Sequence, residues 1–106
     1  MDKINLTMLT DFYELTMANG YLKNGLKDKI AYFDMFFRKV PDNGGFAIMA
    51  GVEQLIEYLN NLRFDDEDIE YLRSKNLFCE EFLRYLKDFR FSCDVWAIPE
   101  GTPIFP

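Results

Sequence analysis

The sequence predicts an α+β fold for a single domain, residues 1–106. Two hydrophobic patterns lead to this expectation. In four segments the apolar residues recur every three to four positions, as they do in amphipathic helices. Shorter apolar or alternating segments, bounded by glycine, proline and asparagine, are typical of strands. The length allows one compact domain with its own core, and the chain has no internal repeat or low-complexity linker.

The first expected helix begins at Thr10 as N-cap and runs to about Asn24. Its apolar residues fall on two faces, so we expect the helix to be largely covered, by its own domain or by a partner. One face carries Tyr13, Met17 and Tyr21, and the other carries Phe12, Leu15 and Leu22.

Three further helices are expected in the middle of the chain, over residues 52–62, from residue 65 onward, and over about 80–89. Asp65 is expected to cap the second of these, with Asp68 at the N3 position. The residues expected to make core contacts are Ile69, Leu72, Phe82, Leu83 and Leu86.

Strands are expected at residues 30–38, 46–50 and 93–98, and a last one begins at Thr102 after a turn at 99–102. The segment 30–38 has a face that mixes aromatic and charged groups, which is unusual for a plain solvent face. The chain stops within its last expected strand, whereas natural domains tend to finish on a completed element or a polar tail. We therefore expect an N-terminal fragment of a longer protein.

Composition excludes several classes of function. The chain has 18 acidic and 12 basic residues and a net charge of −6, which argues against a nucleic-acid-binding face. No apolar run approaches the roughly 18 residues of a membrane span. The chain has no histidine, which excludes a Ser–His–Asp triad, a Cys–His pair and histidine metal sites on this chain. These features favour a cytoplasmic protein.

Other local features have ordinary structural interpretations. Cys79 and Cys93 fit no metal-ligand spacing, and we interpret them as two buried thiols of a reduced cytoplasm. The segment 53–88 holds ten acidic and five basic residues, which we interpret as solvated helix faces. The carboxylates of Asp65–Asp68 and Glu70 fit helix capping better than a metal site, so no metal ligand is assigned.

Two side chains have both a structural and a functional interpretation. Arg38 ends a strand beside the flexible loop Pro41–Gly45 and could present its planar fork to a phosphate or carboxylate, or simply be a solvated cation. Tyr13 could stack on a planar ligand at the start of the first helix, or be a core aromatic. The Asn43-Gly44-Gly45 loop could offer amides to an anion, although such a sequence more often makes a turn.

Longer strings of residues resemble a known family. Leu9-Thr10-Asp11-Phe12-Tyr13-Glu14-Leu15-Thr16-Met17, followed by Gly20-Tyr21, is similar to the opening signature of nicotinate phosphoribosyltransferases. Five more strings fit in the same order, and together the resemblance spans about residues 6–106. These strings are Phe33–Lys39, Gly44–Ile48, Gly51–Gln54, Phe89–Phe91 and Ile98–Thr102.

The resemblance implies an enzyme that joins nicotinate to phosphoribosyl pyrophosphate, giving nicotinate mononucleotide and pyrophosphate in NAD synthesis. In that family ATP hydrolysis, which requires Mg²⁺, is coupled through transient phosphorylation of a histidine. An N-terminal α/β-sandwich domain, with helices packed on a mainly antiparallel sheet, precedes an incomplete α/β barrel that carries most of the active site. This chain would be the first part of the sandwich domain and, without histidine or barrel, would be inactive alone.

The same resemblance implies roles for four residues. Tyr13 would lie over the nicotinate ring, reaching across the interface of a homodimer into the neighbouring subunit's site. Arg38 would lie near the phosphate or pyrophosphate groups. Asp11 and Thr10 would support the position of Tyr13. No catalytic residue is expected on this chain.

Two alternatives remain open from the sequence. A sibling enzyme would use nicotinamide in place of nicotinate, although the strings around Tyr13 and Arg38 favour nicotinate. A different class of protein, an acidic adaptor without enzymatic activity, would use an exposed aromatic face to bind partners. A reading frame that continues into histidine and glycine-rich phosphate loops would exclude the adaptor.

Overall fold

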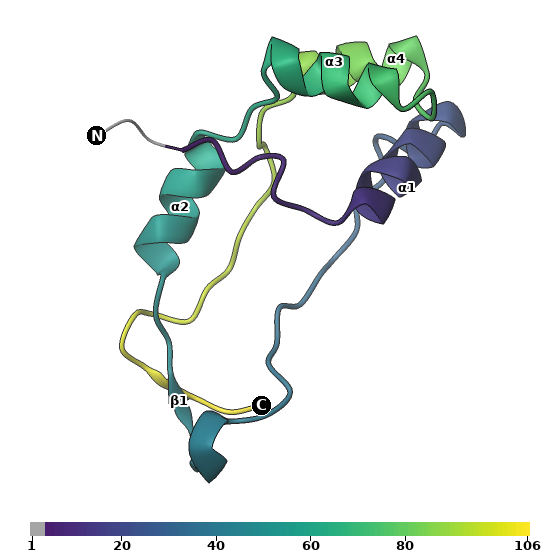
Figure 1. Cartoon of the computed structure of the whole chain (residues 1–106). Helices are drawn as coiled ribbons and strands as arrows, with labels where there is room; N and C mark the ends of the chain where they lie inside the picture. Colours follow the sequence, from purple (N-terminus) through teal and green to yellow (C-terminus); the bar gives the residue numbers. More distant parts are fainter. Residues whose placement is uncertain (1–3) are drawn as a thin grey trace.

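The computed structural model describes residues 4–106, so Met1–Lys3 of the predicted domain lie outside the described part. Helices and a small antiparallel sheet make up these residues, which confirms the α+β class (Figure 1). The elements in chain order are α1 (Phe12–Lys23), the 3₁₀ turn η1 (Pro41–Asn43), β1 (Ala47–Ile48), α2 (Val52–Asn60), α3 (Asp66–Ser74), α4 (Glu80–Lys87) and β2 (Pro103–Ile104).

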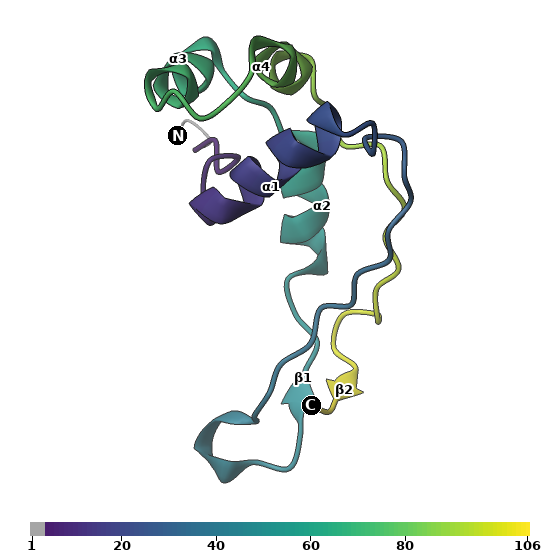
Figure 2. The same ribbon diagram turned by 90° about the vertical axis from the view of Figure 1, so that its right-hand side faces the viewer.

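The chain has a helical end, made of α1, α3 and α4, and an extended arm. The arm consists of the segments 24–51 and 88–106, which carry η1 and the β1–β2 pair. Helices α1, α3 and α4 pack together at one end, and the β1–β2 pair lies at the other, beyond α2 (Figures 1 and 2). The radius of gyration is 16.9 Å, whereas a compact domain of this length has about 13 Å. The described residues therefore do not close around a single central core.

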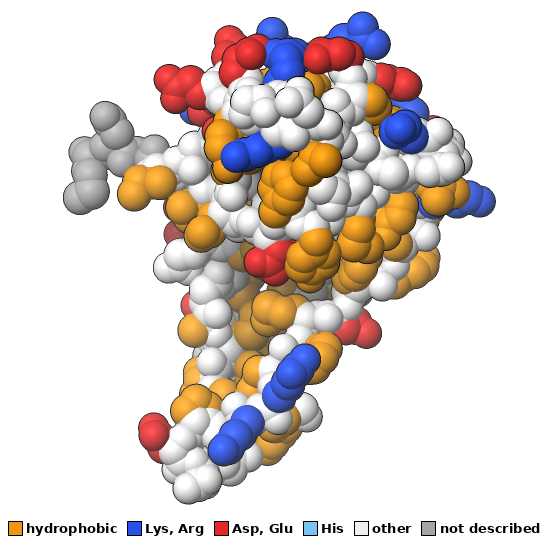
Figure 3. Space-filling model, turned by 45° about the vertical axis from the view of Figure 1, so that its right-hand side comes forward, with side chains coloured by type: hydrophobic (Ala, Val, Ile, Leu, Met, Phe, Trp, Pro, Cys, Tyr) orange, Lys and Arg blue, Asp and Glu red, His pale blue; other side chains and the backbone are white. Residues whose placement is uncertain are grey.

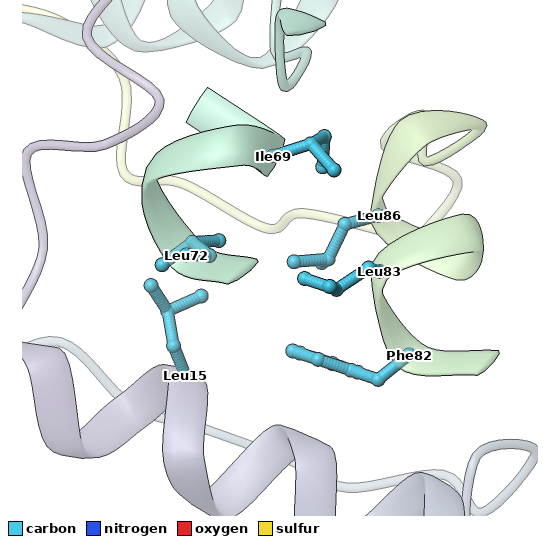
Figure 4. Packing of buried hydrophobic residues seen from close by; sticks show 6 residues of the cluster. All are labelled: Leu15, Ile69, Leu72, Phe82, Leu83 and Leu86. Atoms are coloured by element: carbon cyan, nitrogen blue, oxygen red, sulfur yellow. The ribbon is translucent and has the colours of Figure 1, made fainter. Parts of the chain in front are cut away.

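The core is confined to the helical end. Its six buried side chains come from the facing sides of three helices and converge in Figure 4. They are Leu15 of α1, Ile69 and Leu72 of α3, and Phe82, Leu83 and Leu86 of α4. The core residues expected from the sequence on α3 and α4 are thus confirmed.

Aromatic rings extend this core toward the beginning of α1. The Phe12 ring lies edge-on to Phe78, with ring centroids 5.7 Å apart, and Phe78 stacks on Phe82 at the same separation. Such pairs add stabilisation beyond the apolar area they bury. The inner face of α1 is therefore held against the α3–α4 pair both by Leu15 and by Phe12.

The start of α1 corrects one expectation. Asp11, not Thr10, is the N-cap, and its backbone is extended (φ −73°, ψ 139°) as an N-cap requires. Thr10 instead closes a turn, donating its N–H to the Met8 carbonyl at 2.9 Å, while its hydroxyl donates to the Glu14 carboxylate. Two adjacent residues with good capping chemistry left the boundary ambiguous by one position.

The next two helices agree with the sequence in position but differ in burial. Asp65 is the N-cap of α3, and its N–H donates to the Asp68 carboxylate at 2.9 Å, which confirms the predicted cap. Helix α2 also forms where expected, yet none of its residues is buried, and Ile56 is more than half exposed. Its apolar face therefore lacks a covering element among residues 4–106.

Two expected strands do not form. Segments 30–38 and 93–98 are free of β-ladder hydrogen bonds within the described chain, and most of their aromatic side chains are exposed. Phe33 is 91% exposed and Trp96 is 96% exposed. A strand exists only through bonds to a neighbouring backbone, and none is available here. The expected strands at 46–50 and after 102 are reduced to β1 and β2, which pair Ala47 with Ile104.

Both cysteines are free thiols, and the expectation that both are buried is wrong. Cys79 is half-buried at the start of α4, whereas Cys93 is exposed in the unpaired segment 93–98.

Within the described range, no helix is both long and apolar enough to cross a membrane.

Truncation of Leu72, which is fully buried, should lower the free energy of unfolding by about 2–5 kcal/mol in the Leu72→Ala variant. The matched control is Leu77→Ala, because Leu77 is 58% exposed and should change the same quantity by less than about 0.5 kcal/mol. Urea unfolding followed by circular dichroism measures both. Equal effects would mean that the core lies elsewhere.

Acid should weaken the contact between α3 and α4. The Arg73 guanidinium donates to both carboxylate oxygens of Glu80 at 2.9 and 3.0 Å, and these hydrogen bonds hold the pKa of Glu80 below its usual 4.5. A carboxyl whose folded pKa is lowered adds stability that is present above the unfolded pKa and lost as pH falls through the folded value. The wild-type chain should therefore lose stability below about pH 4.5.

The variant that tests this is Glu80→Gln, which should lose less stability than wild type between about pH 6 and about pH 3. Glu81→Gln is the matched control, since Glu81 is an exposed carboxylate in the same helical turn that lies outside the Arg73 pair. Urea midpoints at the two pH values give the comparison. The same slope in wild type and Glu80→Gln would show that the Arg73 pair does not contribute.

Candidate functional site

Three of the four residues assigned by the resemblance lie together at the beginning of α1. Thr10 and Asp11 precede the helix, and Tyr13 stands in its first turn; all three are exposed. A shallow, open depression of about 430 Å³ lies beside them, lined by Leu9, Thr10, Asp11 and Glu14. The hydroxyl of Thr10 donates to the Glu14 carboxylate, so a side-chain hydrogen bond holds the segment before α1 against its first turn.

Tyr13 belongs to an outward face of α1. Its side chain is 59% exposed, and Met17 and Tyr21, which follow at four-residue intervals, are also about half exposed. The opposite face, with Leu15, is buried against α3 and α4. The described chain thus covers one apolar face of α1 and leaves the other open, so Tyr13 is not part of the core that the described residues form.

Arg38 is exposed in the unpaired segment that leads into η1. Among residues 4–106 its guanidinium has no ion-pair or hydrogen-bond partner, so its five donors are available to an anion. The loop that follows is compact: the Gly44 N–H donates to the Pro41 carbonyl at 3.1 Å, and Asp42 has a positive φ of 58°. The turn interpretation of this loop is confirmed.

Within one chain the structure does not bring Arg38 to Tyr13. Arg38 lies only three residues before η1, which is at the tip of the arm, whereas α1 belongs to the helical end (Figures 1 and 2). The described chain extends over 48 Å in its longest dimension. A small ligand cannot touch both side chains of one protomer in this arrangement.

Glu100 links the start of α2 to the segment before β2. No role was predicted for this residue from the sequence. Its two carboxylate oxygens accept the N–H groups of Gly51 and Val52 at 3.0 and 3.2 Å. An anionic acceptor satisfies free amides at the beginning of α2, where the helix dipole favours negative charge. Gly51 has a φ of 96°, a conformation that strongly favours glycine.

Hydrogen bonds of the sheet reinforce this link. Met49 donates its N–H to the Thr102 carbonyl at 2.8 Å and accepts the Gly101 N–H at 2.8 Å. Two strings that define the resemblance, Gly51–Gln54 and Ile98–Thr102, are therefore in direct contact. Their spacing of nearly fifty residues explains why sequence inspection did not connect them.

Asn19 makes the corresponding link at the helical end. It lies on α1, and its side-chain oxygen accepts the Cys79 N–H at 3.1 Å and the Cys79 thiol at 3.3 Å. Its side-chain nitrogen donates to the Leu77 carbonyl at 3.5 Å. One amide group thus joins α1 to the loop between α3 and α4.

The remaining polar clusters do not form a metal site. Among the residues that the structure describes, no group of three or more Asp, Glu, Cys or His side chains is arranged to hold a metal ion. The larger depression, about 490 Å³ between the end of α1 and α4, is lined by charges of both signs, including Lys27, Arg84, Glu81 and Asp88.

Figure 3 summarises the exposed surface on one side. Charged side chains gather over the helical end, while hydrophobic side chains spread across the middle of this face. Many large hydrophobic side chains of the described chain are exposed, among them Phe33, Met35 and Trp96, and extensive exposed apolar surface marks contacts with other protein.

Comparison with known proteins agrees with the motif strings. The family model of the nicotinate phosphoribosyltransferase (NAPRTase) N-terminal domain matches residues 8–106 of this chain. Nicotinate phosphoribosyltransferase pncB2 of Mycobacterium tuberculosis (strain H37Rv) is 46% identical over 99 residues, covering 93% of this chain and 21% of the relative. The Bacillus subtilis nicotinate phosphoribosyltransferase is 38% identical over 101 residues, covering 95% of this chain and 21% of the relative.

A plant relative shows the same pattern. Nicotinate phosphoribosyltransferase 1 of Arabidopsis thaliana is 41% identical over 101 residues, covering 93% of this chain and 18% of the relative. The chain thus spans about a fifth of the length of the curated relatives it matches. Since the family match covers nearly all of the chain, the chain belongs to the family of nicotinate phosphoribosyltransferase N-terminal domains.

Proposed function

We propose that this chain acts as the N-terminal part of a nicotinate phosphoribosyltransferase, which forms nicotinate mononucleotide and pyrophosphate from nicotinate and phosphoribosyl pyrophosphate. The observation that carries the proposal is the family match over residues 8–106, with relatives that bear this enzyme's name. The same names favour nicotinate over nicotinamide as the base. Because the chain spans a fifth of those relatives, the activity belongs to a longer protein and the isolated chain is inactive.

In this proposal Tyr13 binds the nicotinate ring. The reaction requires the pyridine nitrogen to approach the ribose carbon as pyrophosphate departs, so holding a flat ring in one orientation contributes a proximity effect. An exposed aromatic face on a rigid helix suits this task, since Tyr13 is 59% exposed and its helix is anchored on the opposite side. Thr10 and Asp11, which order the beginning of α1, support the position of Tyr13.

Arg38 binds phosphate or pyrophosphate oxygens. Negative charge develops on the leaving pyrophosphate, and a guanidinium fork stabilises such charge through paired hydrogen bonds. The structure supports this role through the exposure of Arg38 and the absence of any internal partner for it among residues 4–106.

The distance between Tyr13 and Arg38 supports sites shared between subunits. Because one protomer places the two residues at different ends, a substrate that touches both needs two chains. The open face of α1, with Tyr13, Met17 and Tyr21, would then reach into the neighbouring subunit of a homodimer. Burial of this face would also remove apolar side chains from water.

The other family features belong to the remainder of the longer protein. ATP coupling with its Mg²⁺ and the phosphorylated histidine have no counterpart here, since the chain lacks histidine and its described residues offer no metal-binding cluster. The complete α/β-sandwich domain, the incomplete α/β barrel and a cytoplasmic location are likewise proposed for that protein.

The test is a chimeric enzyme in which residues 8–106 replace the matched 99-residue segment of the Mycobacterium tuberculosis relative. The chimera should form nicotinate mononucleotide, and the isolated chain should not. A folded, dimeric chimera without activity would contradict the proposal and favour an adaptor that binds partners without catalysis.

Variants of the chimera should separate the two substrates. Tyr13→Ala should raise the KM for nicotinate about five- to thirtyfold with little change in the KM for phosphoribosyl pyrophosphate, because it removes a stacking contact of about 1–2 kcal/mol. Arg38→Ala should instead lower kcat or raise the KM for phosphoribosyl pyrophosphate, since it removes a charged hydrogen-bond donor.

Each variant has a matched control on this chain. Tyr71→Ala removes a tyrosine of similar exposure from α3, and Lys39→Ala removes the cation next to Arg38. Both controls should leave the two KM values within about twofold of wild type. If Tyr13→Ala leaves the nicotinate KM unchanged, Tyr13 does not bind the ring.

A further inference from the structure

One polar contact adds a directional constraint to the apolar packing of α1. Phe12 packs on Phe78 in the loop between α3 and α4, and Leu15 packs into the core of the three helices, so these apolar contacts decide which side of α1 faces inward. Asn19 is the residue of α1 whose side chain forms directional bonds to another helix or its loop within the described chain. Together with the apolar contacts, these bonds restrict the rotation of α1 about its own axis.

The partners of Asn19 require one orientation of its amide group. Cys79 is the N-cap of α4, and its N–H, with its thiol, donates to the Asn19 oxygen. The Leu77 carbonyl accepts from the Asn19 nitrogen, so the amide group meets a donor and an acceptor of the same short loop. A rotation of α1 by one residue, about 100°, would break these bonds. Half-buried polar groups that lose their partners destabilise the arrangement.

Tyr13 lies six residues before Asn19 on the same helix, about 9 Å along the axis at the usual rise of 1.5 Å per residue. A hydrogen-bonded helix of this length transmits a rotation from one end to the other without bending. The contact of Asn19 therefore affects which way the Tyr13 ring faces, although Asn19 lies on a different face of the helix.

We propose that Asn19 is a positioning residue for nicotinate binding: its amide bonds to Leu77 and Cys79 fix the rotation of α1 and thereby the direction of the Tyr13 ring. This inference rests on the proposed role of Tyr13 in holding the nicotinate ring. Asn19 itself does not touch substrate. Its effect on the reaction passes entirely through the placement of Tyr13.

The first experiment uses the chain itself and its two thiols. Cys79 is half-buried with its thiol bonded to Asn19, whereas Cys93 is exposed and serves as the internal reference. The rate of Cys79 alkylation by iodoacetamide, divided by the rate for Cys93, should rise about tenfold in Asn19→Ala. The Cys79 thiol loses a hydrogen bond and its contact with the Asn19 side chain, and together these losses correspond to about that factor. Mass spectrometry of the two peptides gives the ratio.

Two further variants sharpen this measurement. Asn24→Ala is the matched control, because Asn24 is an asparagine at the end of the same helix whose side chain donates only to the Gly20 carbonyl of α1. It should leave the ratio unchanged. Asn19→Asp keeps an acceptor for the Cys79 N–H but loses the donor to the Leu77 carbonyl, so its ratio should lie between those of wild type and Asn19→Ala.

The second experiment measures nicotinate binding in the chimera. Asn19→Ala should raise the KM for nicotinate about tenfold and leave the KM for phosphoribosyl pyrophosphate unchanged, because misplacing one contact by about 1 Å has effects of at least this size. Asn19→Asp, which keeps the bond to the Cys79 N–H and loses the bond to the Leu77 carbonyl, should restore the nicotinate KM in part. A purely structural role would reduce the amount of folded enzyme without separating the two KM values.

The outcomes distinguish this inference from the proposed function. An inactive wild-type chimera overturns the proposed function, and the thiol ratio still decides whether Asn19 anchors α1. An active chimera in which Tyr13→Ala raises the nicotinate KM while Asn19→Ala does not overturns the positioning role. An unchanged Cys79 ratio in Asn19→Ala also overturns it.

Discussion

The packing of α1 against α3 and α4 is the constraint on which the rest of this chain depends. All six buried core side chains lie on these three helices, and Leu72, Phe82 and Leu83 are almost completely shielded from water. Apolar burial is the main favourable term in folding, so stability is concentrated at this end of the molecule. The arm adds its own local closure at Glu100 but no buried core.

This division explains how the chain presents its candidate site residues. Helix α1 is bound on one side, so its other side, with Tyr13, is held outward in a fixed direction. Arg38 lies near the far end of the arm, where no side chain of the described residues neutralises it. Tyr13 is thus anchored and Arg38 is unpaired, and the two lie far apart. This arrangement suits a surface that contacts another protein segment and forms a binding site together with it.

The sequence predicted what depends on local interactions. Hydrophobic spacing located the four helices, and the Asp65–Asp68 cap was found because its partners are three residues apart. The strands at 30–38 and 93–98 were wrong, since alternation reports which side chains suit a strand and not whether a backbone partner is present. Asn19 and Glu100 were missed because their partners lie 48 to 60 residues away. The resemblance supplied Tyr13 and Arg38, and the structure added their exposure and separation.

Amide hydrogen exchange of the chain, resolved by residue, tests most directly the claim that one three-helix core organises the molecule. The account predicts the slowest exchange in α1, α3 and α4, because these amides open only when the core opens. It predicts rapid exchange throughout 30–38 and 93–98, where the described backbone has no ladder partner. Slow exchange in those two segments, equal to that of the helices, would contradict it by showing that they are paired strands of a larger common core.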